Sequence, residues 1–207
     1  MDADSVELRV LGCLIEKQRT TPDVYPLSLN ALRLACNQTT NREPVVDYDE
    51  PTIRAGLERL SRKGWVRLAS GAGSRAAKYR HLLDETLGVS SAEISLLAVL
   101  MLRGPQTPGE LKQRTERLHP FASLEEVDRV LAGLIERDLV AHLDRRPGQK
   151  EARYAQLLGE SDTETSPAVD VPEHAVPGSE NRLAALEERV ARLEGQLESL
   201  LENVSGA

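Results

Sequence analysis

The spacing of hydrophobic positions in the first part of the chain predicts three helices followed by a β-hairpin. Apolar residues recur at helical spacing over residues 6–15, again over 27–36 and again over 53–60. A loosely alternating run at 65–69 then precedes a Gly-rich tip and a returning run at 76–83. The order from the second helix onward is helix, turn, helix and hairpin, which is the plan of a winged-helix module.

Several residues at the ends of these runs are typical of helix termini. Ser5, Ser28 and Asp49 each precede an apolar run, so we expect them to cap helix N-termini. Pro51 fits the first turn of the third helix, where its missing N–H is not needed. Gly64 is expected to end that helix.

The same order of segments recurs later in the chain. Residues 92–108 match residues 6–22 at an offset of 86, because in both an apolar helix is followed by a basic residue and a Thr-Pro pair. Residues 127–140 match residues 53–66 at an offset of 74. The chain is therefore predicted to contain a tandem duplication.

This duplication predicts a mainly α protein with small β-hairpins (α+β), built from two winged-helix domains at residues 1–83 and 84–158. The two offsets differ by 12 residues, and the excess of the first copy falls in or near 37–48. Because each copy is small for an independent core, we expect the two to pack on each other. In the second copy, Ser123 with Glu126 predicts a capping box at the third helix.

The C-terminal part has a different composition. Residues 159–178 are rich in Ser, Thr, Glu, Asp and Pro and read as an acidic, flexible linker. Residues 179–205 then carry an unbroken a/d heptad seam, which predicts a coiled-coil helix. The seam consists of Leu183, Leu186, Val190, Leu193, Leu197, Leu200 and Val204. We expect a homo-oligomer, with a dimer favoured, although Leu at both a and d leaves trimers and tetramers open; the alternative is a helix that folds back on its own domains.

The net charge of −7 argues at first against a nucleic-acid partner, but the charge is unevenly distributed. Residues 1–83 carry a net charge of +3, residues 84–158 a net charge of −2, and residues 159–207 a net charge of −8. The acidity is thus concentrated in the tail. The first copy is mildly basic, which is compatible with a surface that faces phosphates.

Cysteine content and hydropathy place the chain among cytoplasmic proteins. Cys13 and Cys36 lie inside apolar helical patterns, so they are expected to be small buried hydrophobes rather than a disulfide. No apolar run approaches the roughly 20 residues that span a bilayer, so no membrane partner is expected. The acidic N-terminus lacks the pattern of a secretory signal.

The third helix of each copy is the candidate for contact with double-stranded DNA, since the later helix of such modules lies in the major groove. In the first copy we expect this helix and its wing to contribute Arg54, Arg59, Arg62, Lys63, Ser70, Arg75 and Lys78. The third helix of the second copy offers a mixed set, Asp128, Arg129, Glu136 and Arg137, and its wing offers Arg145, Arg146 and Lys150. The alternative for either helix is a solvated charged face, and for the second copy we favour that alternative.

The polar run that follows the second helix is a further candidate. It contains Asn37, Gln38, Asn41 and Arg42, and amide and guanidinium groups can read adenine and guanine. The alternative, which we favour on chemistry, is a loop whose side chains satisfy its own backbone and helix ends.

No pattern indicates catalysis, a metal or a cofactor. The histidines, at positions 81, 119, 142 and 174, are isolated from one another and have no Cys at metal-ligand spacing. No nucleophile motif or phosphate loop is present, and the Gly-Ala-Gly of residues 71–73 lies at a hairpin tip. We therefore expect a protein that is not an enzyme.

Two runs of the sequence carry a family resemblance, EKQRTTPDVYPLSLNALRLACNQTTNREPV and the later LRGPQTPGEL. They are similar to the YceH-like family of uncharacterised bacterial proteins, and the similarity covers nearly the whole chain. The resemblance implies two winged-helix domains and carries over no catalytic residues. The leading hypothesis is a DNA-binding protein, such as a transcriptional regulator; the rival is an assembly scaffold that uses winged-helix domains to bind proteins.

Overall fold

The computed structural model describes residues 2–69, 77–143 and 151–159, and the structural statements below concern these residues. They form a mixed α/β structure with small antiparallel sheets. The first half (residues 2–81) contains α1 (Ser5–Thr20), a 3₁₀ turn η1 (Pro22–Val24), β1 (Leu27–Ser28), α2 (Leu29–Cys36), α3 (Glu50–Arg62), β2 (Val66–Leu68) and β3 (Lys78–His81). The second half (residues 83–159) contains α4 (Leu83–Leu87), α5 (Ser91–Arg103), α6 (Pro108–Thr115), α7 (Leu124–Glu136), β4 (Val140–Leu143) and β5 (Arg153–Gln156).

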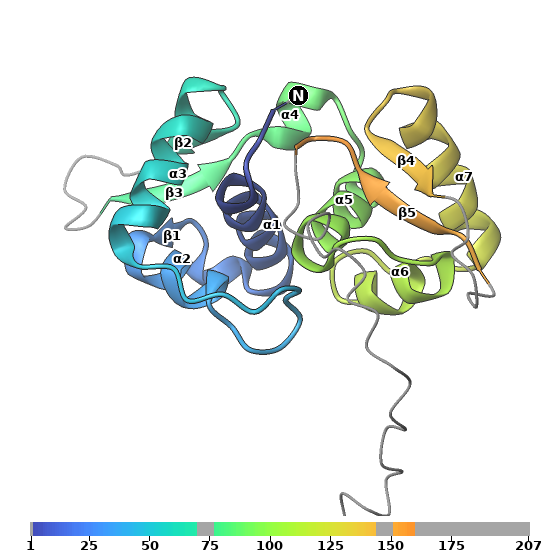
Figure 1. Cartoon of the computed structure of the whole chain (residues 1–207), viewed down its shortest axis with the longest axis horizontal. Helices are drawn as coiled ribbons and strands as arrows, with labels where there is room; N and C mark the ends of the chain where they lie inside the picture. The colour runs from blue at the N-terminus through green and yellow to red at the C-terminus, as the bar shows by residue number, and fades with distance from the viewer. Residues whose placement is uncertain (1, 70–76, 144–150, 160–207) are drawn as a thin grey trace, which may run out of the picture. The chain divides into compact units, whose positions relative to one another are not determined.

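The two halves repeat one arrangement of elements (Figure 1). In the first half α1, α2 and α3 pack on one another, and α5, α6 and α7 do the same in the second half. The first sheet has the order β1-β3-β2 and the second pairs β4 with β5. A single bridge between Gln106 and Tyr154 stands where β1 pairs Leu27 with Tyr79. The repeat seen in the sequence thus extends to the strand pairing.

Helix ends follow the sequence signals with two differences. Ser28 and Asp49 cap α2 and α3, Pro51 lies in the first turn of α3, and Gly64 ends that helix with a φ of 75°. The prediction that Ser5 caps the first helix is wrong, because α1 begins at Ser5 and is capped by Asp4. Its carboxylate accepts from the Glu7 backbone N–H, and the Glu7 carboxylate accepts from the Asp4 N–H, in a complete capping box.

The second difference concerns α7. The Ser123 hydroxyl accepts from the Glu126 N–H at 3.3 Å, as a cap should. The Glu126 carboxylate, however, accepts from the Ala122 N–H at 2.8 Å, so the return bond of the expected capping box is displaced by one residue. Complete boxes occur instead at α5 and α6, each with a Ser or Thr cap and a Glu three residues later.

The core is centred on α1 and α5, which lie side by side between the two halves in Figure 1. Every residue from Leu8 to Ile15 and from Ile94 to Leu102 is buried. A helix buried all round needs neighbours on every side, and here each helix is covered by its own half and by the other central helix. Cys13 and Cys36 are free and buried, as the sequence indicates.

The closest approach of α1 to α5 occurs at Gly12. A Cβ atom added there would lie 2.7 Å from Cγ of Leu102. The Leu102 carbonyl also accepts the backbone N–H of Glu43 at 2.8 Å, so α5 is fixed to the loop that follows α2. The absence of a side chain at position 12 therefore sets the distance between the two halves.

We predict that Gly12→Ala lowers the free energy of unfolding by about 1–3 kcal/mol, because the added methyl overpacks this contact. The matched control is Gly133→Ala in α7, where an added Cβ meets nothing within 4 Å. It should raise the free energy of unfolding by about 0.5–1 kcal/mol through helix propensity. Urea unfolding followed by circular dichroism measures both, and equal stabilities of the two variants would contradict the proposed contact.

Candidate functional site

The exposed face of α3 is set by the residues that the helix buries. Ile53, Leu57 and Leu60 point into the core, which leaves Arg54 and Arg62 exposed on the outside. Arg54 Nη2 lies 2.8 Å from Glu50 Oε1 in an ion pair whose side chains are both about half exposed, so it contributes little to stability and is readily exchanged. Arg62 has no ion-pair partner among the described residues.

The other two expected cations of α3 bind the start of α1. Arg59 Nη2 lies 2.7 Å from Asp4 Oδ2, and Lys63 Nζ lies 2.8 Å from Glu7 Oε1. The Glu7 side chain is 2% exposed, so Lys63 balances a buried carboxylate. Lys63 Nζ also lies 5.6 Å from the centre of the Trp65 ring. These two cations connect α3 to α1 and are less available to a partner than Arg54 and Arg62.

The hairpin adds one cation that the sequence analysis did not single out. Arg67 is exposed on β2, directly opposite Arg80 of β3. Arg80 Nη2 binds Glu85 Oε1 at 3.1 Å. Lys78 lies at the start of β3, half-buried, whereas Ser70 and Arg75 lie outside the described residues. The period-two pattern around the buried Val66 could have identified Arg67 as outward-facing.

Asn37 closes the loop between α2 and α3. Its side-chain amide donates to the Tyr48 carbonyl at 2.8 Å, and its Oδ1 accepts the Tyr48 N–H at 2.9 Å. Both polar atoms of this amide are therefore occupied by the loop's own backbone. At Asn37 the loop thus has the arrangement expected when its side chains satisfy its own backbone.

Arg42 holds the same loop from within. The side chain is buried, and its Nε donates to the Ala35 carbonyl at 3.1 Å. Nη1 lies 2.7 Å from Glu16 Oε2, and Nη2 donates to Gln38 Oε1 at 3.1 Å. Burial raises the pKa of the Glu16 carboxyl, but the hydrogen bonds and charges of Arg42 and, to a lesser extent, Lys17 hold that pKa below its ordinary value. Arg42 is thus a structural residue here.

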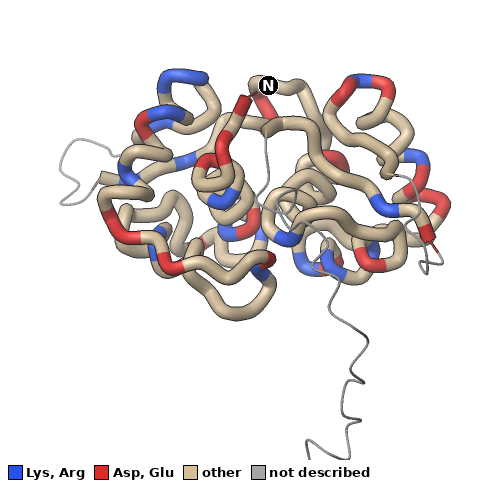
Figure 2. Tube along the Cα trace, viewed as in Figure 1, with Lys and Arg blue, Asp and Glu red and all other residues tan. Residues whose placement is uncertain are grey.

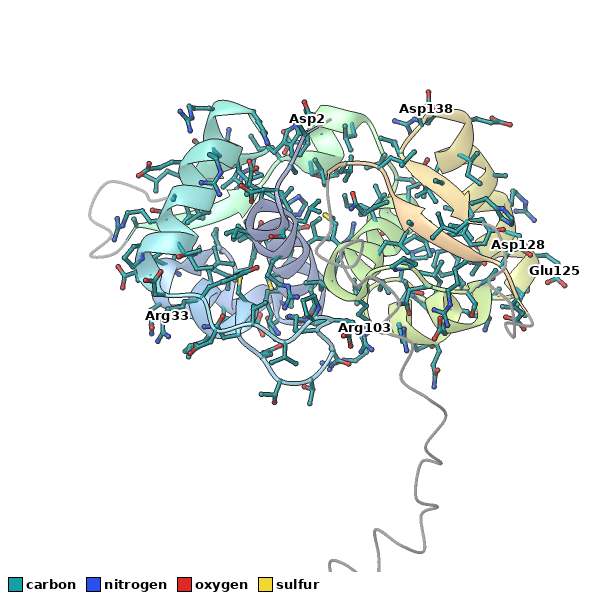
Figure 3. All side chains as sticks on the ribbon, in the orientation of Figure 1. Asp2, Arg33, Arg103, Glu125, Asp128 and Asp138 are labelled. Carbon is teal, nitrogen blue, oxygen red and sulfur yellow. The ribbon has the colours of Figure 1, made fainter. Side chains whose placement is uncertain are left out.

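Gln38 and Asn41, together with Asn37, line a cavity of about 880 Å³ between this loop and the second half. From the second half, its wall is completed by Arg103 at the end of α5, Arg114 in α6 and Arg117 just after α6. Figure 3 shows Arg103 between the loop and α6. Figure 2 shows Lys and Arg positions, with some acidic ones among them, at the end of α5 and in the α6 region.

The corresponding helix of the second half is not a basic surface. At the offset of 74 residues, Asp128 and Glu136 of α7 stand where α3 has Arg54 and Arg62. Arg137 Nη1 lies 3.2 Å from Glu93 Oε1. Asp128 projects from the outer side of α7 in Figure 3. The expected second-wing residues Arg145, Arg146 and Lys150 lie outside the described residues.

Within the described ranges, no group of three or more His, Cys, Asp or Glu side chains could hold a metal ion. His81 is buried, with Nε2 at 2.7 Å from Gln18 Oε1, and burial lowers its pKa to about 4. No helix in the described part of the chain is long and apolar enough to cross a bilayer.

Comparison with known proteins gives a consistent family result. Residues 3–149 match the family described as "Protein of unknown function, DUF480". The chain belongs to this family. A UPF0502 protein of Shewanella amazonensis is 47% identical, with 96% of this chain and 97% of that protein covered. A UPF0502 protein of Pelobacter propionicus is 49% identical, with 99% and 93% covered.

We predict that Arg42→Met lowers the free energy of unfolding by about 3 kcal/mol at neutral pH, because Glu16 is left without its buried partner. The matched control Arg33→Met, which removes an arginine on α2 that has no ion-pair partner among the described residues, should change stability by less than about 0.5 kcal/mol. Urea unfolding measures the difference.

The loss of unfolding free energy in Arg42→Met should depend on pH, and the direction of that dependence follows from the lowered pKa of Glu16. Since Arg42 lowers the pKa of Glu16, its stabilisation is present above the ordinary value of 4.5 and is lost as the pH falls through the lowered pKa. The deficit should therefore shrink in acid. A deficit that stays constant from pH 7 to pH 3 would show that the ion pair does not cause it.

Proposed function

We propose that this protein is a non-catalytic, cytoplasmic DNA-binding protein of the transcriptional-regulator class, and that each half is a winged-helix domain. The order of three helices and a hairpin in each half, with the third helix presenting its outer face to solvent, supports this assignment. The repeat of that order, including the strand pairing, supports a duplication.

The observation that carries the proposal is the difference between α3 and α7. The two helices occupy equivalent places, yet α3 exposes Arg54 and Arg62 where α7 exposes Asp128 and Glu136. In the first half, Arg67 extends the positive charge onto the hairpin. Such a surface suits phosphate contacts, which position a protein on a duplex without reading its sequence.

The acidic α7 favours a second candidate, a protein-binding role for the second half. Leu124 and Ile135 of this helix are 45% and 36% exposed, and the acidic residues beside them disfavour DNA. In this alternative the chain is an assembly scaffold. A stable protein complex that survives nuclease treatment, formed by a protein that does not bind duplex DNA, would favour it.

We further propose that the chain forms homodimers through residues 179–205, which lie outside the described residues. The a/d spacing of Leu183, Leu186, Val190, Leu193, Leu197, Leu200 and Val204 supports this, since a lone helix would leave that seam in water. A dimer would present two α3 helices to one duplex and gain affinity by multivalency.

We predict that the double variant Arg54→Ala/Arg62→Ala weakens binding to a random-sequence duplex about tenfold at low salt and reduces the salt slope by about 2, because each lost phosphate contact removes about 1. The matched control Arg129→Ala removes an exposed arginine from α7 and should leave both quantities unchanged. Fluorescence anisotropy measures them.

Two outcomes would contradict this assignment. One is no binding by the unaltered protein even at high micromolar concentration and low salt. The other is an equal loss of affinity in Arg129→Ala and in the double variant, which would indicate a non-specific effect of positive charge rather than an α3 interface.

For the dimer, sedimentation equilibrium of the full chain should give twice the chain mass. Replacing Leu186 and Leu193 with Asp should give the monomer, because two charges then enter the seam. A monomeric unaltered protein would refute the proposal, and an unchanged dimer in the double variant would place the interface elsewhere.

A further inference from the structure

The cavity between the loop and the second half has the size of a small-molecule site. Its volume is about 880 Å³, within the range of roughly 300–1,000 Å³ typical of ligand pockets. Its walls come from the end of α1, the loop after α2, the end of α5, and α6. No described residue of α3 or of the β2–β3 hairpin lines it, so in the described part of the chain it is separate from the surface proposed to bind DNA.

The wall carries an excess of positive charge. Among the described residues, Lys17, Arg103, Arg114 and Arg117 line the cavity, against one carboxylate, that of Glu16. That carboxylate is already occupied, because Glu16 lies 2.7 Å from both Arg42 and Lys17. Glu16 thus forms its ion pairs with Arg42 and Lys17 rather than with the arginines contributed by the second half.

Two of these arginines lack a carboxylate partner among the described residues. Arg103 donates to the side-chain oxygen of Asn41, which is neutral, and the exposed Arg117 has no ion-pair partner within the described ranges. Arg114 Nη2 lies 3.5 Å from Glu110 Oε1, but Glu110 also binds Arg153 Nη1 at 2.9 Å. One carboxylate thus serves two guanidinium groups.

The arginines also act on one another electrostatically. Partial burial lowers the pKa of Arg103, and the positive charges of Arg114 and Arg42 lower it further, against the opposing effect of the Glu16 and Glu110 carboxylates. Guanidinium groups that line one cavity repel one another, and an anion between them would relieve that repulsion.

The first half supplies neutral hydrogen-bonding groups on the facing wall. Gln38 lines the cavity, and its Oε1 accepts from Arg42 and Lys17, so its side-chain N–H groups are not used in these two bonds. Thr39 and Thr40 are exposed and line the cavity beside it. Hydroxyl and amide donors opposite arginines are a common environment for phosphate oxygens.

We propose that this cavity is a binding site for a small ligand that carries a diphosphate or longer polyphosphate, held by Arg103, Arg114 and Arg117 from the second half and by the Gln38–Asn41 loop from the first. A diphosphate can accept bonds from several planar guanidinium forks at once, whereas a single carboxylate would satisfy only one. The ligand bridges the two halves, because neither half alone provides both walls.

Isothermal titration of the full chain with pyrophosphate and with ADP, at low ionic strength, tests this site. Saturable binding of at least one probe is expected, and Arg103→Gln and Arg117→Gln should each weaken it at least about tenfold. Arg117 is exposed, so its replacement leaves the fold intact even if Arg103→Gln disturbs the contact with Asn41. Tighter binding of ADP than of pyrophosphate would support a contribution of the loop to nucleoside recognition.

The controls separate this site from the DNA surface. Arg33→Gln, on α2 outside the cavity, and Arg54→Ala/Arg62→Ala, on α3, should both leave pyrophosphate affinity within about twofold of the unaltered protein. Absence of saturable binding of either probe up to millimolar concentration would overturn the proposal. Equal pyrophosphate affinity in Arg117→Gln, Arg103→Gln and the unaltered protein would also overturn it. The proposal would likewise be overturned if the unaltered protein bound neither probe and these two variants lost affinity for duplex DNA.

Discussion

The packing of α1 against α5 is the contact on which the rest of the described structure depends. Each of these helices is the centre of its own half, and each completes the core of the other, so two small repeats share one continuous core. The contact requires a glycine at position 12, because the side chain of Leu102 occupies the space that a Cβ would need. The shared core explains why such small repeats can be stable, since neither half has to bury its apolar surface alone.

A second constraint follows from that packing. The loop after α2 lies against the end of α5, and Arg42 anchors it by bonds to Ala35 and Glu16. The insertion that distinguishes the first half, in or near residues 37–48, is therefore an ordered loop held by Arg42, and it forms one wall of the cavity. Facing it, α5, α6 and the residues just after α6 contribute arginines from the other half of the chain, so the cavity lies where the two halves pack together.

Local features were predictable from the sequence, because they depend on residues a few positions apart. The caps Ser28 and Asp49, the buried stripe of α3 and the buried cysteines are examples. The pairing of Arg59 and Lys63 with Asp4 and Glu7 was not predictable, since helical periodicity shows only that these cations lie off the buried stripe. The same holds for the burial of Arg42, which needs an acceptor on α1, and for a cavity whose two walls are contributed by different repeats.

We propose that the two repeats share a scaffold but that only the first presents a surface for DNA. An NMR titration of the isotopically labelled full chain with a short random-sequence duplex tests it most directly, because it reports on both halves in one experiment. We predict saturable shifts of backbone amides in α3 and the β2–β3 hairpin, with α7 and the β4–β5 hairpin unchanged. Shifts confined to the second half, or no shifts at saturating duplex, would contradict it.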